Sequence, residues 1–289
     1  MNKYHTSVLL QEVLTYLQVT PGKLFIDATL GGGGHTEALL DQGGIVLGLD
    51  ADEEAISHVR KRLEGRTGLT LARGNFRDID LLAQETNFTK VSGILFDVGV
   101  SSHQLDEAAR GFSFQDGPLD MRMDDRLSVT AADLVNGMTN KELQEMFVSL
   151  GEERYARSIA KNIVEQRKER LFETTGDLIG VIRQSAPNLH SKVHPATRVF
   201  QALRIAVNDE LHALDEALPK AVELLESGGR LVVISFHSLE DRIVKRAFVA
   251  FEEAGKGEVL TKRPIEAQED ELGDNRRSRS AKLRVFQKA

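Results

Sequence analysis

The first hundred residues of the chain alternate short apolar runs with amphipathic stretches. Apolar runs that predict strands lie at 24–26, 45–49, 69–72 and 93–96. Helical patterns follow the first two runs at 36–41 and 52–63, and the second of them begins with Asp52 at a capping position. Strands that are apolar on both faces and alternate with helices are typical of a parallel sheet covered on both sides.

This alternation stops after the fourth run and returns only after residue 204. Between 106 and 204 the pattern predicts no strand: 109–126 is a loop rich in Gly, Asp and Arg, and helices are expected at 141–150, 152–168, 176–185 and 195–207. The remainder predicts a helix at 209–226, a strand at 229–235, a helix at 239–250 and an edge strand at 282–286. The expected fold is α/β: a doubly wound, mostly parallel sheet domain made of 1–105 and 206–289, with an inserted helical domain at 106–205.

The composition fits a globular protein and excludes several classes of chemistry. Of the 289 residues, 41% are hydrophobic and 28% are charged, which are ordinary values for a folded domain. The chain has no cysteine, so disulfides, thiolate metal sites and a cysteine nucleophile are excluded. We expect a soluble, cytoplasmic protein without a membrane span, because no signal-peptide pattern opens the chain and no apolar run approaches about 20 residues.

The formal charge of −7 argues against a nucleic-acid partner, but the charge is unevenly distributed. Residues 178–208 include no Asp or Glu, and their cations are Arg183, Lys192, Arg198 and Arg204. The end of the chain is also basic, with Arg276, Arg277, Arg279, Lys282, Arg284 and Lys288. Two basic tracts in an acidic chain indicate local contact with phosphates, although a solvated surface explains either tract alone.

A run of four consecutive glycines, 31–34, connects the first strand to the first helix. Glycine permits positive φ and a close approach of the backbone to a ligand, because it has no Cβ atom. The second strand ends at Asp50, 19 residues after Gly31, where a doubly wound fold places a carboxylate on ribose hydroxyl groups. The loop and Asp50 together predict a site for an adenosine-containing ligand, although a flexible turn explains the glycines alone.

The details of the loop distinguish two such ligands. A dinucleotide site expects G-x-G-x-x-G, but this chain has Thr36 at the position of the last glycine. Asp27 precedes the turn, as in the first motif of class I methyltransferases. S-adenosylmethionine carries a cationic sulfonium and no phosphate, so nearby carboxylates suit it. We therefore expect S-adenosyl-L-methionine as the cofactor, with an NAD-dependent oxidoreductase on the same fold as the alternative.

Two further residues follow predicted strands. Phe76 comes after the third strand, where it is a candidate to stack on the adenine, although core packing is the commoner explanation for a lone aromatic residue. Asp97 ends the fourth strand, and ligands bind at the carboxyl ends of parallel strands. Asp97 is therefore expected near the reacting group, with a turn or cap aspartate as the alternative.

Motifs spread over nearly the whole chain are similar to those of the RsmH (MraW) family. They are His5–Leu10, the loop 31–35, Asp97–Ser102 with Gln104–Asp106, Arg110–Phe114, Asp116–Asp124, His194–Arg198, Ser235–Arg242 and Arg277–Arg284. The stretch Asp116–Asp124 is the most specific of these.

The resemblance implies a Rossmann-like class I methyltransferase domain with an inserted helical domain that recognises the substrate. It implies N4-methylation of a specific cytidine in the decoding centre of 16S rRNA, either as free RNA or in the small ribosomal subunit. It further implies that the cofactor is contacted by Gly33, Gly34, His35, Asp50, Phe76, Asp97 and Gln104. A non-catalytic RNA-binding factor in ribosome assembly is the second alternative.

A cytosine amine is a weak nucleophile, so its methylation needs alignment and an acceptor for the amine proton. We expect Asp97, or a backbone carbonyl group in 98–101, to be that acceptor. No aromatic residue follows Asp97, where the DNA amine methyltransferases carry one. Phe112 and Phe114 are therefore candidates to stack on the base, with core packing as the alternative.

The helix from Pro195 is the expected RNA-binding element. Its polar face carries Thr197, Gln201, Arg204 and Asn208, and its apolar face carries Val199, Leu203 and Ala206. We assign RNA contact to Lys192, Arg198 and Arg204, with a plain amphipathic surface helix as the alternative.

No histidine spacing in the chain predicts a metal site. His237, which follows the strand at 229–235, is a candidate to line the pocket. For Asp120 and Asp124 we expect salt bridges with Arg122 or Arg126 rather than a bound Mg²⁺. The sequence leaves the oligomeric state open, and a homodimer is one expectation.

Overall fold

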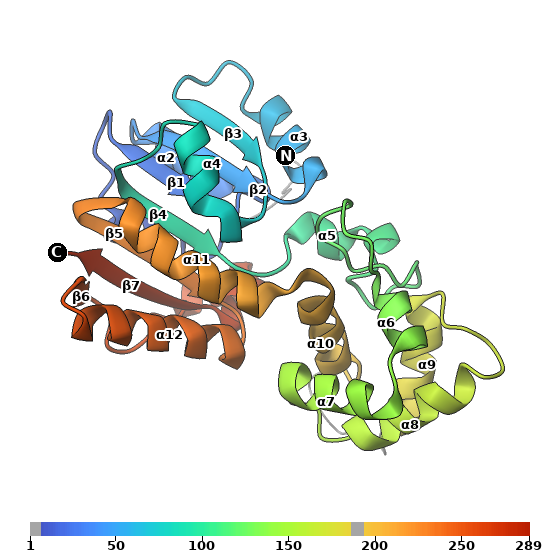
Figure 1. The fold of residues 1–289 in the computed structure, drawn as a ribbon. Helices are drawn as coiled ribbons and strands as arrows, with labels where there is room; N and C mark the ends of the chain where they lie inside the picture. The colour runs from blue at the N-terminus through green and yellow to red at the C-terminus, as the bar shows by residue number, and fades with distance from the viewer. Residues whose placement is uncertain (1–6, 186–193) are drawn as a thin grey trace. The chain divides into compact units, whose positions relative to one another are not determined.

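The computed structural model describes residues 7–185 and 194–289, which form two compact units (Figure 1). Unit 1 consists of Met1–Gly99 and Leu211–Ala289, and unit 2 of Val100–Glu210. The sequence prediction placed these two boundaries after residues 105 and 205, six residues later and five residues earlier than in the structure. Among the described residues, no helix is both long and apolar enough to cross a membrane.

Unit 1 contains a seven-stranded sheet in the order β3-β2-β1-β4-β5-β7-β6. The strands are β1 (Leu24–Asp27), β2 (Ile45–Asp50), β3 (Leu69–Arg73), β4 (Val91–Asp97), β5 (Leu225–Ser235), β6 (Gly257–Val259) and β7 (Lys282–Lys288). The strands from β1 to β5 pair in parallel, whereas β7 runs antiparallel to both of its neighbours. This is the mostly parallel, doubly wound, Rossmann-like sheet that the sequence predicts.

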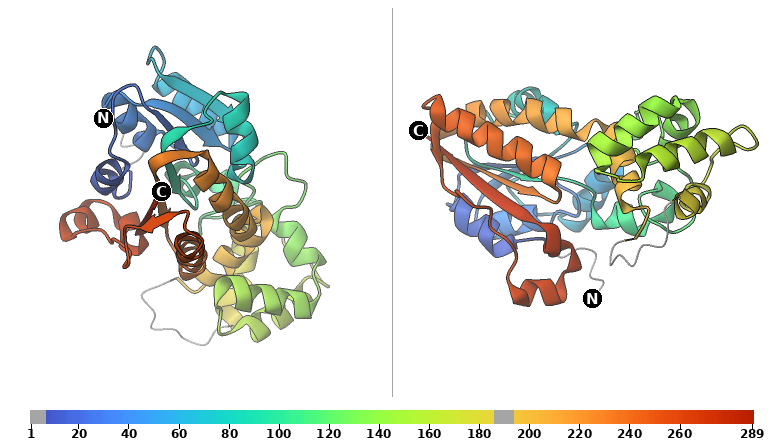
Figure 2. Two further views of the ribbon diagram at one scale, coloured as in Figure 1. Left: turned by 60° about the vertical axis from the view of Figure 1, so that its left-hand side comes forward. Right: turned by 90° about the horizontal axis from the view of Figure 1, so that it is seen from below.

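Two layers of helices cover the sheet, as the apolar strands require (Figure 2). The helices of unit 1 are α1 (Leu10–Leu17), α2 (Gly34–Asp41), α3 (Glu53–Arg62), α4 (Ile79–Glu85), α11 (Glu210–Leu224), α12 (Ser238–Glu253) and α13 (Glu269–Asp274). Alternate residues of one strand enter opposite cores: Phe25 packs with α1, α2 and α3, and Ile26 with α4, α11 and α12. This alternation confirms a sheet buried on both faces.

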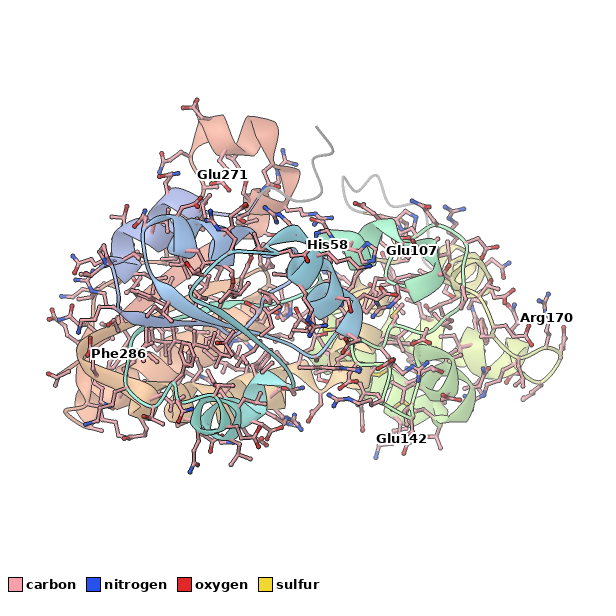
Figure 3. The ribbon with its side chains drawn as sticks, turned by 90° about the horizontal axis from the view of Figure 1, so that it is seen from above. His58, Glu107, Glu142, Arg170, Glu271 and Phe286 are labelled. Atoms are coloured by element: carbon pink, nitrogen blue, oxygen red, sulfur yellow. The ribbon has the colours of Figure 1, made fainter. Side chains whose placement is uncertain are left out.

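The position of β7 differs from the sequence prediction. We expected 282–286 to be an edge strand, but β7 lies between β5 and β6, and the edge is the three-residue β6. The buried residues of β7 include Phe286, labelled in Figure 3, and also Arg284. The charged Arg284 suggested an exposed face, whereas its guanidinium is neutralised inside the unit by Asp241. The short β6 has no apolar run that could have predicted it.

Unit 2 is helical and has a hydrophobic core of its own. Its α-helices are α5 (Ser102–Asp106), α6 (Ala131–Gly137), α7 (Asn140–Gly151), α8 (Ala156–Gln166), α9 (Thr175–Ser185) and α10 (Thr197–Asn208). The four helical patterns predicted for this region correspond to α7 to α10, whereas α5 and α6 were missed. Its described residues contain no strand, only an isolated bridge between Pro118 and Thr174.

Candidate functional site

Three carboxylates end three neighbouring strands of unit 1. Asp27 is the last residue of β1, Asp50 of β2 and Asp97 of β4. Because β1 lies between β2 and β4 and all three run in parallel, these carboxylates share one edge of the sheet. The strand order reverses at this point, which is where open α/β sheets bind their ligands.

The carboxylate of Asp50 ties the glycine loop to the sheet. Its Oδ2 accepts a hydrogen bond from the backbone N–H of Gly31 (2.8 Å), and its Oδ1 accepts one from the N–H of Asp52 (2.9 Å). Burial raises the pKa of Asp50 to about 6, against the lowering effect of these two hydrogen bonds. Each carboxylate oxygen can accept a second hydrogen bond, so Asp50 retains acceptor capacity for ligand hydroxyl groups.

Two of the four loop glycines are required by the packing of the protein itself. Gly33 is the N-cap of α2 with φ +77°, and a Cβ atom there would lie 2.8 Å from Cγ2 of Val59 on α3. A Cβ atom on Gly34 would overlap the hydroxyl group of Ser7. The sequence interpretation attributed these glycines to close approach of a ligand. The structure gives them a packing role, and contact of Gly33 and Gly34 with the cofactor stays a prediction.

His35 connects the loop to the end of β4. Its ring is buried, with Nε2 3.0 Å from the carbonyl oxygen of Val8 and Nδ1 3.7 Å from Oδ2 of Asp97. Burial lowers the pKa of His35 to about 4, although the hydrogen bond to Val8 opposes the shift. A neutral ring that donates from Nε2 to Val8 presents its Nδ1 lone pair to Asp97.

Asp97 is the most perturbed carboxyl group at this edge. Burial raises its pKa to about 8, and the negative charges of Asp27 and Glu240 raise it further, whereas Arg277 lowers it. Its Oδ1 atom is buried and has no hydrogen-bond partner among the described residues. Buried carboxylate oxygens are normally hydrogen-bonded, so this atom lacks the partner that a ligand can supply.

Two threonines that the sequence interpretation did not select hold the carboxylates in place. The hydroxyl group of Thr29 accepts a hydrogen bond from the backbone N–H of Asp97 (2.6 Å), and the N–H of Thr29 donates to Asp27. Thr36 donates its hydroxyl hydrogen to Oδ2 of Asp27 (2.7 Å). Thr36 occupies the position of the missing third glycine, so that departure from the dinucleotide pattern was the signal for its role.

Glu240 was another omission. Its Oε2 accepts hydrogen bonds from the backbone N–H groups of Phe236 (2.8 Å) and His237 (3.2 Å) at the start of α12. His237 caps this helix and its Nε2 lies 3.1 Å from Oε1 of Glu240. The spacing of an N-cap residue and a glutamate three positions later is a capping-box pattern that the sequence already contained.

The last two proposed cofactor residues lie in different units. Phe76 follows β3 in unit 1, is half-buried, and packs edge-on against Phe96 with 5.6 Å between ring centroids. Gln104 belongs to unit 2, where its Oε1 accepts a hydrogen bond from the N–H of Ser101 (3.0 Å) and closes the capping box of α5. The structure thus brings Gly33, Gly34, His35, Asp50, Phe76 and Asp97 to one edge of unit 1, and describes Gln104 within unit 2.

The proposed RNA-binding residues differ in their surroundings. Arg198 is exposed, and its Nη1 donates to the carbonyl oxygen of Glu152 (3.0 Å). Arg204 is largely buried, and its Nε and Nη2 donate to the two carboxylate oxygens of Glu210 (2.8 and 2.9 Å). Lys192 lies outside the described residues.

The polar face of α10 is directed into unit 2. Gln201 donates to the carbonyl oxygen of Leu150, and the buried Asn208 binds the backbone of Met121 and Met123. These contacts hold the Asp116–Asp124 loop in place. They also show that α10 is an internal helix of unit 2, unlike the amphipathic surface helix considered as an alternative.

Much of the C-terminal basic tract serves the fold. Arg284 is buried and makes two hydrogen bonds to Asp241, and Lys288 donates to the carbonyl oxygens of Glu223 and Leu225 at the end of α11. These side chains have partners inside unit 1.

Asp120 and Asp124 form the predicted salt bridges. Asp120 accepts two hydrogen bonds from Arg122 (2.8 and 2.7 Å), and Asp124 is paired with Arg126 (2.7 Å). The described part of the chain contains no cluster of His, Asp and Glu that could hold a metal ion.

Comparison with known proteins gives one consistent result. A family model described as the MraW methylase family matches residues 2–289. The chain is similar to the ribosomal RNA small subunit methyltransferase H of Deinococcus radiodurans, with 49% identity over 286 residues, 99% of this chain and 90% of that protein. The protein of the same name from Fusobacterium nucleatum is 45% identical over 307 residues, 99% of this chain and 98% of that protein.

Proposed function

The chain belongs to the MraW (RsmH) family of S-adenosylmethionine-dependent methyltransferases, and on this basis we propose that it methylates N4 of one cytidine in the decoding centre of 16S rRNA. The relatives carry the name of small-subunit ribosomal RNA methyltransferases over almost the whole length of the chain. This name argues against the two alternatives, a nicotinamide-dependent oxidoreductase and a non-catalytic assembly factor. The proposed substrate places the activity in the cytoplasm.

The observation that carries the proposal is the buried Oδ1 atom of Asp97, which has no hydrogen-bond partner among the described residues. It lies at the edge where the carboxylates of Asp27 and Asp50 also end their strands. An edge with several buried carboxylates suits a cationic ligand better than an anionic pyrophosphate. The site therefore fits S-adenosylmethionine, which supplies an electrophilic methyl group on a positively charged sulfur.

Within this site we assign the cofactor to Gly33, Gly34, His35, Asp50, Phe76, Asp97 and Gln104. Asp50 would accept hydrogen bonds from ribose hydroxyl groups with the lone pairs that the loop does not use. The half-buried ring of Phe76 would contact the adenine. The rings and carboxylates at this edge are held by their own packing, so little ordering is needed when a ligand binds.

We assign the proton acceptor to Asp97. With its pKa near 8, Asp97 holds a proton at neutral pH in the free protein. A cation bound next to it favours the ionised form, so Oδ1 then becomes an acceptor for the hydrogen of the cytosine amine. The hydrogen bond that the backbone N–H of Asp97 donates to the hydroxyl oxygen of Thr29 positions this carboxyl group, since it fixes the backbone of Asp97.

Contact with RNA is assigned to unit 2, principally through Arg198. Its guanidinium is exposed and uses one donor on the carbonyl oxygen of Glu152, which leaves further donors for a phosphate. Arg204 is also proposed to contact RNA. Its guanidinium is paired with Glu210, so a phosphate would have to share this guanidinium with Glu210 or displace Glu210 from it.

The test is transfer of a tritiated methyl group from S-adenosylmethionine to 16S rRNA, measured on naked RNA and on intact small subunits. Digestion to nucleosides and mass spectrometry identify the product, and N4-methylcytidine is expected. Absence of transfer to either substrate, or a methyl group on another atom, contradicts the proposal.

Asp97→Asn separates the chemical role of Asp97 from a binding role. The variant keeps the size of the side chain but cannot take up the amine proton. We expect near-normal affinity for the neutral product S-adenosylhomocysteine, measured by calorimetry, and a loss of turnover of about 100-fold or more, as is typical for a lost general base. Normal turnover with weakened cofactor affinity assigns Asp97 to binding alone. Thr15→Ala, an exposed change on α1, is the control.

A further inference from the structure

Unit 2 carries a pair of stacked aromatic rings on its surface. The side chain of Phe114 is 42% exposed, although phenylalanine side chains are usually buried. Its ring stacks on the imidazole of His194, with 4.1 Å between the centroids and 22° between the planes. The ring of Phe200 supports it at 68°, with a centroid distance of 5.1 Å. Phe114 is thus held in one orientation while a large part of its ring remains accessible.

Its neighbour Phe112 shows that the exposure of Phe114 is not a general property of this segment. Phe112 is buried in the hydrophobic core of unit 2, as the core-packing alternative anticipated. Phe114, two residues later, is absent from that core and packs on His194 instead. Core packing therefore accounts for one of the two aromatic side chains and leaves the other to be explained.

Exposed arginines lie on the segments that carry the pair. Arg183 is exposed at the end of α9 and is close enough to His194 to affect its titration. Arg198 is exposed in the first turn of α10, and residues 178–208 contain no acidic residue. An accessible ring near an exposed arginine fits a nucleotide, since the ring can contact the base and the guanidinium can contact the backbone phosphate.

The imidazole of His194 is neutral and held in one orientation. Burial, and then the positive charge of Arg183, lower the pKa of His194, so its ring is neutral at pH 7. Its Nδ1 accepts a hydrogen bond from the backbone N–H of Ala196 (3.3 Å), which fixes the ring plane and places the hydrogen on Nε2. The two stacked rings are therefore held in place by contacts within unit 2, without a ligand.

We propose that the Phe114–His194 pair is a stacking platform for one unpaired base of the RNA substrate, flanked by Arg183 and Arg198 as phosphate contacts. The platform rests on the proposed function for the identity of the RNA. It adds a second recognition element, built from unit 2 alone, to the chemistry at the strand ends of unit 1. Stacking is tolerant of base identity, so this platform contributes affinity and orientation more than sequence preference.

The test measures binding of a single-stranded RNA that contains the fluorescent base 2-aminopurine, whose emission is quenched by stacking. Phe114→Ala is expected to weaken binding roughly 5- to 100-fold and to reduce the quenching, in line with the usual effect of removing one base-stacking ring. Phe114→Tyr keeps a flat ring and is expected to bind like the unmodified protein, whereas Phe114→Leu keeps apolar volume only and is expected to resemble Phe114→Ala.

The controls separate the platform from folding and from the proposed function. Leu171→Ala removes another exposed apolar side chain of unit 2 and is expected to leave RNA binding unchanged. Equal affinities of the unmodified protein and Phe114→Ala, with equal melting temperatures, overturn the platform. So does a loss of methylation on intact subunits with unchanged binding of naked RNA, because that result assigns Phe114 to a protein partner. Failure of the unmodified protein to methylate any RNA overturns the proposed function. The RNA affinities of the unmodified protein and Phe114→Ala would still test the stacking platform.

Discussion

At the scale of single residues, the edge of the sheet in unit 1 concentrates buried carboxyl groups that ionise less readily than exposed ones. Asp27, Asp50 and Asp97 all have pKa values raised by burial, and Asp97 is raised furthest because Asp27 and Glu240 face it. His35, the nearest base, is itself held neutral by burial. Such a cluster costs folding free energy whenever it ionises, and a cationic ligand relieves that cost.

This cost makes the stability of the protein depend on pH. The folded-state pKa of Asp97, about 8, lies above the ordinary value of 3.8, so the folded state binds the extra proton between these limits. The contribution to stability is complete below about pH 4 and is lost as the pH rises through 8. We expect the melting temperature of Asp97→Asn to increase relative to that of the unmodified protein as the pH rises from 5 to 9, because the unmodified protein loses this contribution progressively over that range. Melting curves of the two proteins that stay parallel over this range contradict the assignment.

Gly33 permits a quantitative test of the packing role of the loop. Gly33→Ala places a methyl group 2.8 Å from Val59 at φ +77°, so strain and overlap both destabilise the protein, by about 2–4 kcal/mol in total. Gly65→Ala has a similar φ, +80°, but open space around the Cβ position, and is expected to cost about 1–2 kcal/mol. Urea unfolding measures both. Adding Val59→Ala to Gly33→Ala should cost less than the two changes made separately, and a purely additive result removes the overlap from the explanation.

At the scale of secondary-structure elements, the sequence predicted what depends on local pattern. The strands β1 to β5 and the helices α2, α3 and α7 to α12 follow from apolar runs, helical periodicity and caps such as Asp52. The edge location of Asp27, Asp50 and Asp97 follows from the same pattern. The sequence interpretation failed where the environment of a residue depends on a partner that is distant in the chain. Arg284 was expected at the surface with the other basic residues, but its ion pair with Asp241 allows it to be buried.

The same limit applies to helix α10. Its polar positions were correctly grouped on one face, but the face contacts the backbone of Leu150, Met121 and Met123 inside unit 2. Periodicity shows which residues share a face and says nothing about what the face contacts. For the same reason, the sequence could not show that Phe112 is buried whereas Phe114, two residues later, is exposed.

The interior position of β7 predicts that Arg284 is needed for stability. Arg284→Ala removes the main partner of the carboxylate of Asp241, whose side chain is largely buried. The ammonium group of Lys282, 3.9 Å away, would be left as a weaker ion-pair partner. We expect a loss of about 3 kcal/mol in the free energy of unfolding, measured with urea. The control Lys256→Ala removes an exposed pair with Glu223 and is expected to cost less than about 1 kcal/mol. A cost for Arg284→Ala as small as that of the control means that the pair contributes little.

At the scale of the whole molecule, the proposed function requires an acidic chain to bind a polyanion. The net charge is −7, so long-range attraction cannot draw RNA to the protein as a whole, and affinity depends on local cations that are not used by the fold. Arg204, Arg284 and Lys288 have partners inside their units, whereas Arg183 and Arg198 are exposed. The effective RNA-binding charge is therefore smaller than the two basic tracts in the sequence indicate.

The salt dependence of RNA binding tests this distribution. Arg198→Gln is expected to reduce the slope of log affinity against log salt concentration by about 0.7, the value for one phosphate contact on a single strand. Lys141→Gln removes another exposed cation of the same unit, whose neighbour is Glu145, and is expected to leave the slope unchanged. An equal reduction by both changes indicates general charge attraction instead of a specific contact at Arg198.

The interior position of β7, the last strand in the sequence, also constrains the order in which the molecule folds. Unit 2 is one continuous stretch, Val100–Glu210, so all of its residues have been synthesised before β5, β6 and β7 exist. Unit 1 is completed only when Lys282–Lys288 reach the gap between β5 and β6. During translation the helical unit can therefore fold first. Until the C-terminal strands are made, the incomplete sheet has an unpaired edge that is prone to aggregation and would need protection by chaperones.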